Sequence, residues 1–240
     1  MTIVNIHVGT SGWSYREWKG SFYPPELPAA AMLRFYASRF STVEVNNSFY
    51  RTPSERALLN WAEQVPAEFR FVMKASRRIT HNSRLTDQDG SLAYFLRAVT
   101  PLGPRLGPTL FQLPPTFEKD LIRLQGFLEK LPRRWPAAIE FRHLSWFEEP
   151  VYELLRAHDV ALVGVDMDEG EEAGAVLVPT ASWGYLRLRR ADYGRSSLQE
   201  WSRRIQEQPW SEAYVFLKHE EGSPRGPGAA ELFRSLLHPA

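Results

Sequence analysis

Ionisable side chains directly follow a short apolar run in "AAIEFRHLSW", in the middle of the chain, where Glu140, Arg142 and His143 occur close together. Because successive side chains of a strand point to opposite faces, Ile139 and Phe141 would share one face and Glu140 and Arg142 the other. A carboxylate beside a guanidinium can bind an anion, transfer a proton or form a buried ion pair. This stretch is therefore the first candidate for a site.

The same alternation places polar side chains on the corresponding face of most other apolar runs. They are Glu44, Asn46, Lys74, Gln112, Asp166, Arg187, Arg189 and Lys218. With Glu140 and Arg142, the set contains three carboxylates and five cations. An excess of positive charge in a concave site favours an anionic ligand such as phosphate or carboxylate.

We therefore expect an enzyme that binds a small anionic substrate. The predicted anion-binding residues are Arg142, Arg187, Arg189 and Lys218. Glu140 or Glu44 would act as general acid or base, and Asp166 would be the third carboxylate of the catalytic set. Lys74 would lower the pKa of a carboxylate or stabilise developing negative charge. The reaction class stays open between hydrolysis, isomerisation and lyase chemistry.

Two other hypotheses fit the same residues. The charges could form an internal ion-pair network, because buried charges are costly unless they are paired. The protein could also bind an anion without turnover. Replacing Glu140 with Gln separates a site, where turnover is lost and folding is intact, from a network, where the melting temperature falls strongly.

A divalent metal is a further alternative, in which Glu44, Glu140 and Asp166 with His81 or His143 would bind Mg, Mn or Zn. Such a set would suit a phosphodiesterase that resembles the apurinic-site endonucleases and binds nucleic acid. However, the sequence has no HxH or HExxH spacing, and five neighbouring cations disfavour a metal. We therefore assign no metal ligand, and the sequence requires no cofactor.

The loops after the first three apolar runs carry aromatic and polar side chains, in "TSGWSYREWKGSFYPP", "NNSFYRTP" and "RRITH". Such side chains can stack on a sugar or a base, or they can simply close the mouth of the fold. The remaining predicted substrate-binding residues are Trp13, Tyr15, Asn46, Tyr50, His81, Gln112 and His143.

Composition excludes several classes of protein. The 240 residues include no cysteine, which excludes disulfides, iron–sulfur clusters, thiolate zinc sites and cysteine nucleophiles. The formal net charge of +1 gives no overall attraction to nucleic acid or to an anionic membrane. The N-terminus lacks the pattern of a secretory signal, and no apolar run approaches the roughly 20 residues of a membrane span. We expect a cytoplasmic protein with no membrane association; the oligomeric state is not readable from the sequence.

Eight short apolar runs must position these side chains. They are "IHVGT" at Ile6, "TVEVN" at Thr42, "FRFVMKA" at Phe69, "PTLFQL" at Pro108, "AAIEFR" at Ala137, "ALVGVD" at Ala161, "YLRLR" at Tyr185 and "AYVFLKH" at Ala213. Between or after them, helical periodicity predicts helices at 29–39, 54–64, 91–99, 118–131, 150–158, 197–206 and 229–237. Eight strand–helix units indicate one TIM-like (β/α)8 barrel domain over residues 1–240. Residues 167–182 lack helical periodicity, so the sixth helix should be missing or reduced.

Five motifs resemble the domain-of-unknown-function-72 (DUF72, YecE-like) family, in order and with similar spacing from His7 to Asp166. They are "HVGTSGWSYREWKGSFYP", "STVEVNNSFYRTPS", "FRFVMKASRRITH", "LGPTLFQLPPTF" and "AIEFRHLSW". The resemblance implies a TIM-like barrel but no particular activity. It singles out Trp13, Tyr15, Glu44, Asn46, Phe49, Tyr50, Lys74, His81, Gln112, Glu140, Arg142, His143 and Trp146.

The sequence departs from the family pattern towards its C-terminus. Where many relatives have Tyr-x-Arg-x-His-Gly, "YLRLRR" keeps Tyr185 and Arg187 but has Arg189 and Arg190 at the His-Gly positions. Where many have Asn-Asn-Asp after an aromatic residue, Lys218, His219 and Glu220 stand here. These changes make the rim of the predicted barrel more cationic.

Overall fold

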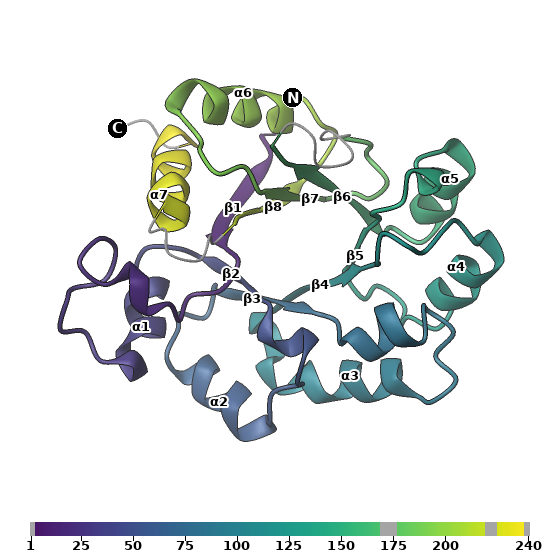
Figure 1. Ribbon diagram of the computed structural model, residues 1–240, viewed down its shortest axis with the longest axis horizontal. Helices are drawn as coiled ribbons and strands as arrows, with labels where there is room; N and C mark the ends of the chain where they lie inside the picture. Colours follow the sequence, from purple (N-terminus) through teal and green to yellow (C-terminus); the bar gives the residue numbers. More distant parts are fainter. Residues whose placement is uncertain (1–2, 169–176, 219–224, 238–240) are drawn as a thin grey trace.

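Eight parallel strands form one sheet, in the order β1-β8-β7-β6-β5-β4-β3-β2 (Figure 1). The structure is a computed structural model and describes residues 3–168, 177–218 and 225–237. The strands are β1 (Asn5–Thr10), β2 (Thr42–Val45), β3 (Arg70–Lys74), β4 (Leu106–Gln112), β5 (Ala137–Glu140), β6 (Ala161–Asp166), β7 (Gly184–Leu188) and β8 (Glu212–Leu217). Each strand begins within two residues of its predicted start. The eight-stranded TIM-like barrel predicted from the sequence is confirmed.

Helices surround the strands on the outside of the barrel (Figure 1). They are α1 (Met32–Ala37), α2 (Glu55–Glu63), α3 (Ser91–Val99), α4 (Leu121–Leu128), α5 (Glu149–Ala157), α6 (Arg195–Gln206) and α7 (Arg225–Leu237). Side-chain caps fix two of the starts: Ser54 accepts from the Ala57 amide at 3.3 Å, and Asp120 accepts from the Arg123 amide at 2.9 Å. α7 begins four residues before its predicted start, because proline and glycine in "RGPG" lie in its first turn, where proline is tolerated.

Short helical turns occupy several connections. They are η1 (Arg16–Trp18), η2 (Ala29–Ala31), η3 (Asn47–Phe49), η4 (Arg78–Asn82), η5 (Thr100–Arg105) and η6 (Leu144–Trp146). Between β6 and β7, residues 167–168 and 177–183 contain no helix, as predicted, while residues 169–176 lie outside the described part of the chain. In the described residues, no helix is long and apolar enough to cross a membrane.

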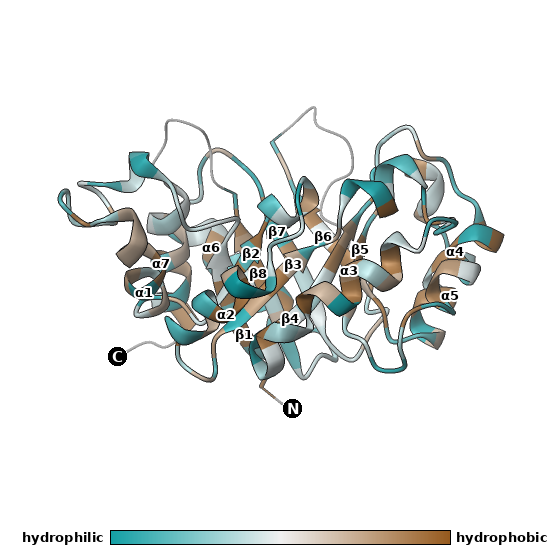
Figure 2. Cartoon of the chain, turned by 90° about the horizontal axis from the view of Figure 1, so that it is seen from below, coloured by the Kyte–Doolittle hydropathy of each residue, from teal (hydrophilic) through white to brown (hydrophobic). Residues whose placement is uncertain are grey.

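Apolar side chains fill both sides of the strands. Val72, Leu110, Val163, Tyr214 and Phe216 belong to a small cluster inside the barrel, and a larger cluster packs between the strands and the helices. Hydrophobic residues, brown in Figure 2, are accordingly concentrated on the strands in the centre of the molecule. The inner cluster fixes which side chains of each strand point inward.

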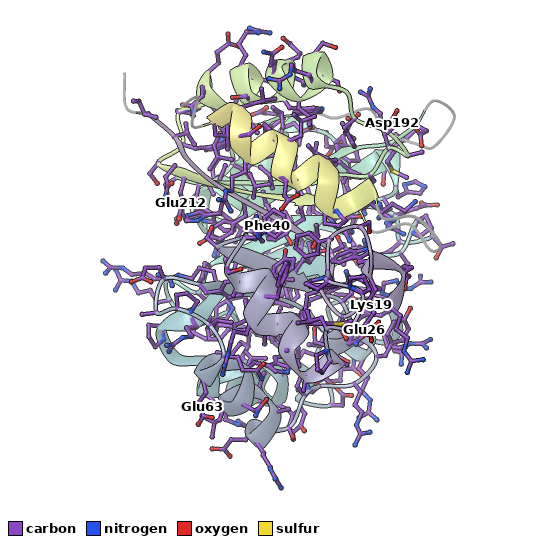
Figure 3. The ribbon with its side chains drawn as sticks, turned by 90° about the vertical axis from the view of Figure 1, so that its left-hand side faces the viewer. Lys19, Glu26, Phe40, Glu63, Asp192 and Glu212 are labelled. Atoms are coloured by element: carbon purple, nitrogen blue, oxygen red, sulfur yellow. The ribbon has the colours of Figure 1, made fainter. Side chains whose placement is uncertain are left out.

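The strands all run in one direction, so the loops that follow them share one end of the barrel. Lys19 and Glu26 after β1 and Asp192 after β7 lie at this end in Figure 3, whereas Glu212, the first residue of β8, lies at the opposite end. In TIM barrels the catalytic groups lie at the C-terminal ends of the strands. We therefore expect the site at the barrel end that carries Lys19 and Asp192.

The barrel closes between β1 and β2 through a tyrosine. The Thr10 amide donates to the Tyr36 hydroxyl at 2.9 Å, and that hydroxyl donates to the Thr42 carbonyl at 3.0 Å. The two backbones approach so closely that a Cβ on Gly9 would lie 2.2 Å from the Thr42 carbonyl oxygen. Glycine at position 9 and the phenol of Tyr36 together take the place of a regular ladder of hydrogen bonds.

Candidate active site

Two buried glutamates share one arginine inside the barrel. Arg187 Nη2 lies 2.8 Å from Glu44 Oε1, and Arg187 Nη1 lies 2.6 Å from Glu140 Oε2. Glu44 is 0% exposed, Glu140 1% and Arg187 5%. We call these three residues the inner charge cluster. The alternation within β2, β5 and β7 brings them together, as the sequence predicted.

Other donors fill the remaining acceptor positions of the two carboxylates. Glu44 also accepts from Tyr185 at 2.7 Å, Ser11 at 2.9 Å and Asn46 at 3.2 Å. Glu140 also accepts from Gln112 at 2.8 Å and Arg142 at 3.0 Å. A carboxylate offers about four lone-pair positions, so Glu44 is saturated and Glu140 nearly so.

The inner charge cluster holds both glutamates ionised. Burial alone would raise the pKa of Glu44, but Arg187, the Tyr185 hydroxyl and Lys74 outweigh it and lower that pKa below its ordinary value. Burial would also raise the pKa of Glu140, but Arg187 and Arg142 outweigh burial and lower that pKa below its ordinary value. A carboxylate with a lowered pKa is a poor proton acceptor near neutral pH, so the geometry favours positioning roles for both.

Lys74 stands at the end of β3 without a carboxylate partner. Its Nζ lies 4.5 Å from the centre of the Phe49 ring. Within the described residues its ammonium makes no hydrogen bond or ion pair. Burial lowers the pKa of Lys74 to about 8, and Arg187 adds to the effect while Glu44 and Glu140 oppose it. A substantial share of Lys74 is therefore neutral near physiological pH, which an ordinary lysine is not.

Two further arginines lie near the inner charge cluster. The Arg142 side chain is 34% exposed and donates through Nε to Glu140. Arg189 is partly buried, and its Nε has no hydrogen-bond partner among the described residues. Burial and the nearby Arg187 lower the pKa of the Arg189 guanidinium. We call Lys74, Arg142 and Arg189 the outer cations.

The site carries more positive than negative charge. Four cations, Lys74, Arg142, Arg187 and Arg189, face two carboxylates, Glu44 and Glu140. The buried Nε of Arg187 also lacks a partner among the described residues. Unsatisfied buried N–H groups and excess positive charge both favour an anionic acceptor.

Asp166 does not belong to this site, and its predicted inward orientation is wrong. Val163 and Val165 are the side chains of β6 that face the barrel interior, so Asp166 points to the helices. There it accepts from Trp201 Nε1 and the Tyr193 hydroxyl, both at 3.0 Å, and pairs with Arg190 at 2.9 Å. The strand is apolar on both faces, so its alternation could not be read from the sequence.

The metal-binding set considered from the sequence does not assemble. Asp166 lies on the helix side, away from Glu44 and Glu140, whose oxygens already accept four and three donors. Within residues 3–168, 177–218 and 225–237 no group of three His, Cys, Asp or Glu side chains could hold a metal ion. The carboxylates that the phosphodiesterase hypothesis requires as metal ligands therefore do not all lie together.

The two predicted histidines occupy different settings. His143 accepts from the Ser145 amide at 3.3 Å and lies 2.9 Å from the Ser145 hydroxyl, so it caps the η6 turn. His81 lies edge-on to Phe49, with ring centres 4.9 Å apart. Burial, together with Lys74, Arg142 and Arg77, lowers the pKa of His81. Only His81 adjoins the outer cations.

The predicted aromatic residues lie beside the barrel mouth rather than over the inner charge cluster. Trp13, Tyr15 and Asn46 line a cleft of about 370 Å³ between α1 and α2, together with Asn60 and Trp61. None of the described residues that line it is charged. Asn46 both lines this cleft and donates to the Glu44 carboxylate. Tyr50, also predicted, is 74% exposed and lies outside the cleft.

Lys218 directly follows β8 and lines a separate cleft of about 360 Å³ with Arg190, Tyr193 and the start of α7. The neighbouring His219 and Glu220, at positions where the sequence departs from the family pattern, lie outside the described residues. Trp146, which the resemblance singled out, is fully buried, stacks on Phe141 and donates to the Phe117 carbonyl at 2.6 Å. Its role is to hold the loop after β5.

Strand alternation as applied to the sequence did not assign Ser11 or Tyr185 to the site, and the resemblance singled out Phe49 without giving it a role. Ser11 and Tyr185 donate to Glu44, and Phe49 faces Lys74. Tyr185 could have been found, because it lies two residues before Arg187 in "YLRLR" and so shares its face. Nothing in the sequence indicates that Phe49, in a turn, would lie against the Lys74 ammonium.

Comparison with known proteins gives a family and a fold. The sequence matches the family described as "Protein of unknown function DUF72" over residues 7–240. It is 34% identical over 143 residues to UPF0759 protein YecE of Escherichia coli K12, which covers 59% of this chain and 50% of that protein. It is 31% identical over 156 residues to UPF0759 protein YunF of Bacillus subtilis, covering 62% and 54%. The match thus spans about half the length of these curated relatives.

Solved structures agree with the barrel described above. A DUF72 family protein of Thermotoga maritima has a TM-score of 0.80 and 28% identity, covering 97% of this chain and 99% of that one. A DUF72 family protein of Enterococcus faecalis has a TM-score of 0.79 and 20% identity, covering 100% of both chains, and shows the fold alone. With a family match across almost its entire length, the chain belongs to the DUF72 family.

Proposed function

We propose that this chain is an enzyme that binds a small anionic substrate at the C-terminal ends of its strands. The outer cations would hold the phosphate or carboxylate of the substrate. The observation that carries the proposal is the uncompensated charge: the inner charge cluster already pairs Arg187 with both glutamates, so Lys74 and Arg189 are left without an anionic partner among the described residues. Guanidinium and ammonium groups in this setting bind an anion strongly.

Lys74 is the group best suited to chemistry in this site. Glu44 and Glu140 stay ionised and hydrogen-bonded, whereas the pKa of Lys74, lowered to about 8 by burial, allows it to give or take a proton near neutral pH. This assignment replaces Glu140 and Glu44 with Lys74 as the proton-transfer group. It favours reactions that need an amine base or nucleophile, in the isomerase and lyase classes.

Thermal unfolding in the presence of anions tests the binding step. We expect phosphate and small phosphorylated compounds to raise the melting temperature of the wild-type protein, with an effect that falls as salt is added. Arg189→Met should abolish the increase, because it removes a cation that contacts no carboxylate. Arg203→Met is the matched control: this arginine is 58% exposed on α6 and pairs with Glu200 and Glu207.

An equal response of the wild type and Arg189→Met would contradict the proposal. Saturable binding without turnover of any bound compound would instead select a non-catalytic anion-binding protein. Stabilisation by divalent metals alone would favour the phosphodiesterase alternative.

A further inference from the structure

The ammonium of Lys74 forms no hydrogen bond or ion pair with a carboxylate among the described residues. Glu44 accepts four donors and Glu140 three, so groups other than the ammonium already occupy most acceptor positions of both carboxylates. The ring of Phe49 covers the amine instead, at 4.5 Å. The structure therefore keeps a partly buried amine apart from the carboxylates that would otherwise fix it as a cation.

Lys74 also lies where a substrate would meet it. It is the last residue of β3, at the barrel end where TIM-barrel active sites lie. Arg142 and Arg187 are close enough to disfavour its charged form electrostatically. A lysine whose pKa is lowered by burial and by neighbouring fixed cations is the arrangement that activates an amine as a nucleophile.

We infer that Lys74 forms an imine with the carbonyl carbon of a small anionic oxo compound, a 2-oxo acid or a phosphorylated ketone. The inference rests on the proposed function, because the outer arginines Arg142 and Arg189 would hold the carboxylate or phosphate of that compound. The outer cations require an anionic group on the substrate, and the nucleophilic amine additionally requires a carbonyl group.

The chemistry balances without a further reactant. The lone pair of neutral Lys74 Nζ attacks the carbonyl carbon and gives a carbinolamine. Both amine hydrogens then leave with the former carbonyl oxygen as water, and a carbon–nitrogen double bond remains. Uptake of one proton from solvent gives the protonated imine, which withdraws electrons from the neighbouring carbon, the activation needed for isomerase or lyase chemistry.

The groups that face Lys74 are consistent with this step. They are Phe49 from η3, His81 from η4, Glu44 from β2, Glu140 from β5, Arg142 after β5, and Arg187 from β7. His81 lies on the same phenylalanine as Lys74, and its lowered pKa leaves it neutral near pH 7. It is thus able to take up a proton during the reaction.

Reductive trapping tests the inference. The protein is incubated with cyanoborohydride and either pyruvate or dihydroxyacetone phosphate, and the products are examined by intact mass and peptide mass mapping. We expect one adduct per chain, on Lys74, with the mass of the oxo compound less one oxygen atom. The more reactive of the two compounds identifies the anion, carboxylate or phosphate, that the site prefers.

Variants separate imine formation from anion binding. Lys74→Arg keeps the positive charge but cannot form an imine, so it should bind lactate or glycerol phosphate and give no adduct. Lys119→Arg is the control, since Lys119 pairs with Glu148 on the surface and should leave trapping unchanged.

Each outcome decides between the two proposals. An adduct on Lys74 that is lost in Lys74→Arg supports the imine. Binding of lactate or glycerol phosphate with no adduct overturns the imine and leaves the anion-binding enzyme standing. Adducts spread over the five lysines, or placed on another lysine, also overturn it. Absence of both binding and trapping rejects the two proposals together.

Discussion

The inner charge cluster and the outer cations lie a few side chains apart but obey different physical rules. In the inner charge cluster each charge has a partner of opposite sign within 2.8 Å, and all three side chains are buried. Among the outer cations, only Arg142 contacts a carboxylate through a described ion pair. Fully paired groups hold a structure together, whereas groups left without a partner are available to a ligand. The structural network therefore accounts for the inner charge cluster, and the proposed binding site is formed by the outer cations.

The largest effect is expected when the inner charge cluster is broken. Arg187→Met leaves Glu44 and Glu140 buried without their shared cation, so the free energy of unfolding should fall by about 3–5 kcal/mol. Urea unfolding followed by circular dichroism measures it. A triple variant that also carries Glu44→Gln and Glu140→Gln removes the uncompensated charge and should recover part of the loss. If Arg187→Met lowers the free energy of unfolding by less than about 1 kcal/mol, as expected for an exposed ion pair, the structural role of the cluster is contradicted.

A smaller effect is expected at Asp166, on the other side of the barrel wall. Asp166→Ala leaves Trp201 Nε1 and the Tyr193 hydroxyl without their acceptor, which should lower the free energy of unfolding by about 1–3 kcal/mol. Anion binding should persist, because Asp166 lies outside the barrel mouth. The exposed Asp192, replaced by Ala, is the control for unfolding. Loss of anion binding in folded Asp166→Ala would place Asp166 back in the site.

The smallest loss of stability is expected when an outer cation is removed. Lys74→Met breaks no ion pair among the described residues and removes a partly buried charge, so it should not lower the free energy of unfolding at pH 7. The pKa of Lys74 is lowered to about 8 in the folded protein, against about 10.4 in an unfolded chain. Between these values the unfolded chain binds more protons, so stability rises with pH.

The wild type should therefore gain stability relative to Lys74→Met from pH 8 to about pH 10.4, with no further difference above that range. Urea unfolding of both proteins at several pH values measures the gain, with Lys119→Met as a second reference. A constant difference across this range would show that Lys74 titrates as it does in the unfolded chain. That result would remove the main support for Lys74 as the reactive amine.

Alternation along the strands predicted most of the mouth. It placed Glu44, Lys74, Gln112, Glu140 and Arg187 correctly, because each of these strands has a polar residue at its C-terminal end and apolar residues on the helix side. It failed at β6, which is apolar on both faces. In that strand no other polar residue indicates which face points into the barrel, and Asp166 was assigned to the wrong side.

Partner choice could not be predicted in the same way. The sequence gives an inventory of charges on a rim, but it does not say that Arg187 joins both glutamates while Lys74 joins neither. That division depends on the register between strands far apart in the chain and on Tyr185, Ser11 and Gln112, which fill the carboxylate oxygens. Local patterning therefore found the members of the site, and three-dimensional geometry assigned their roles.

The junction between β1 and β2 has a consequence for how the molecule is made. β1 forms its regular ladder with β8, at the other end of the chain, and meets β2 only through an isolated bridge and the Tyr36 hydroxyl. During synthesis the first strand therefore leaves the ribosome long before its main partner exists. Its edge stays open until β8 is available, and contacts of such long sequence separation slow folding. Closure of the ring, which completes Glu44 with donors from β7 and from the residue after β1, thus waits for translation of β8.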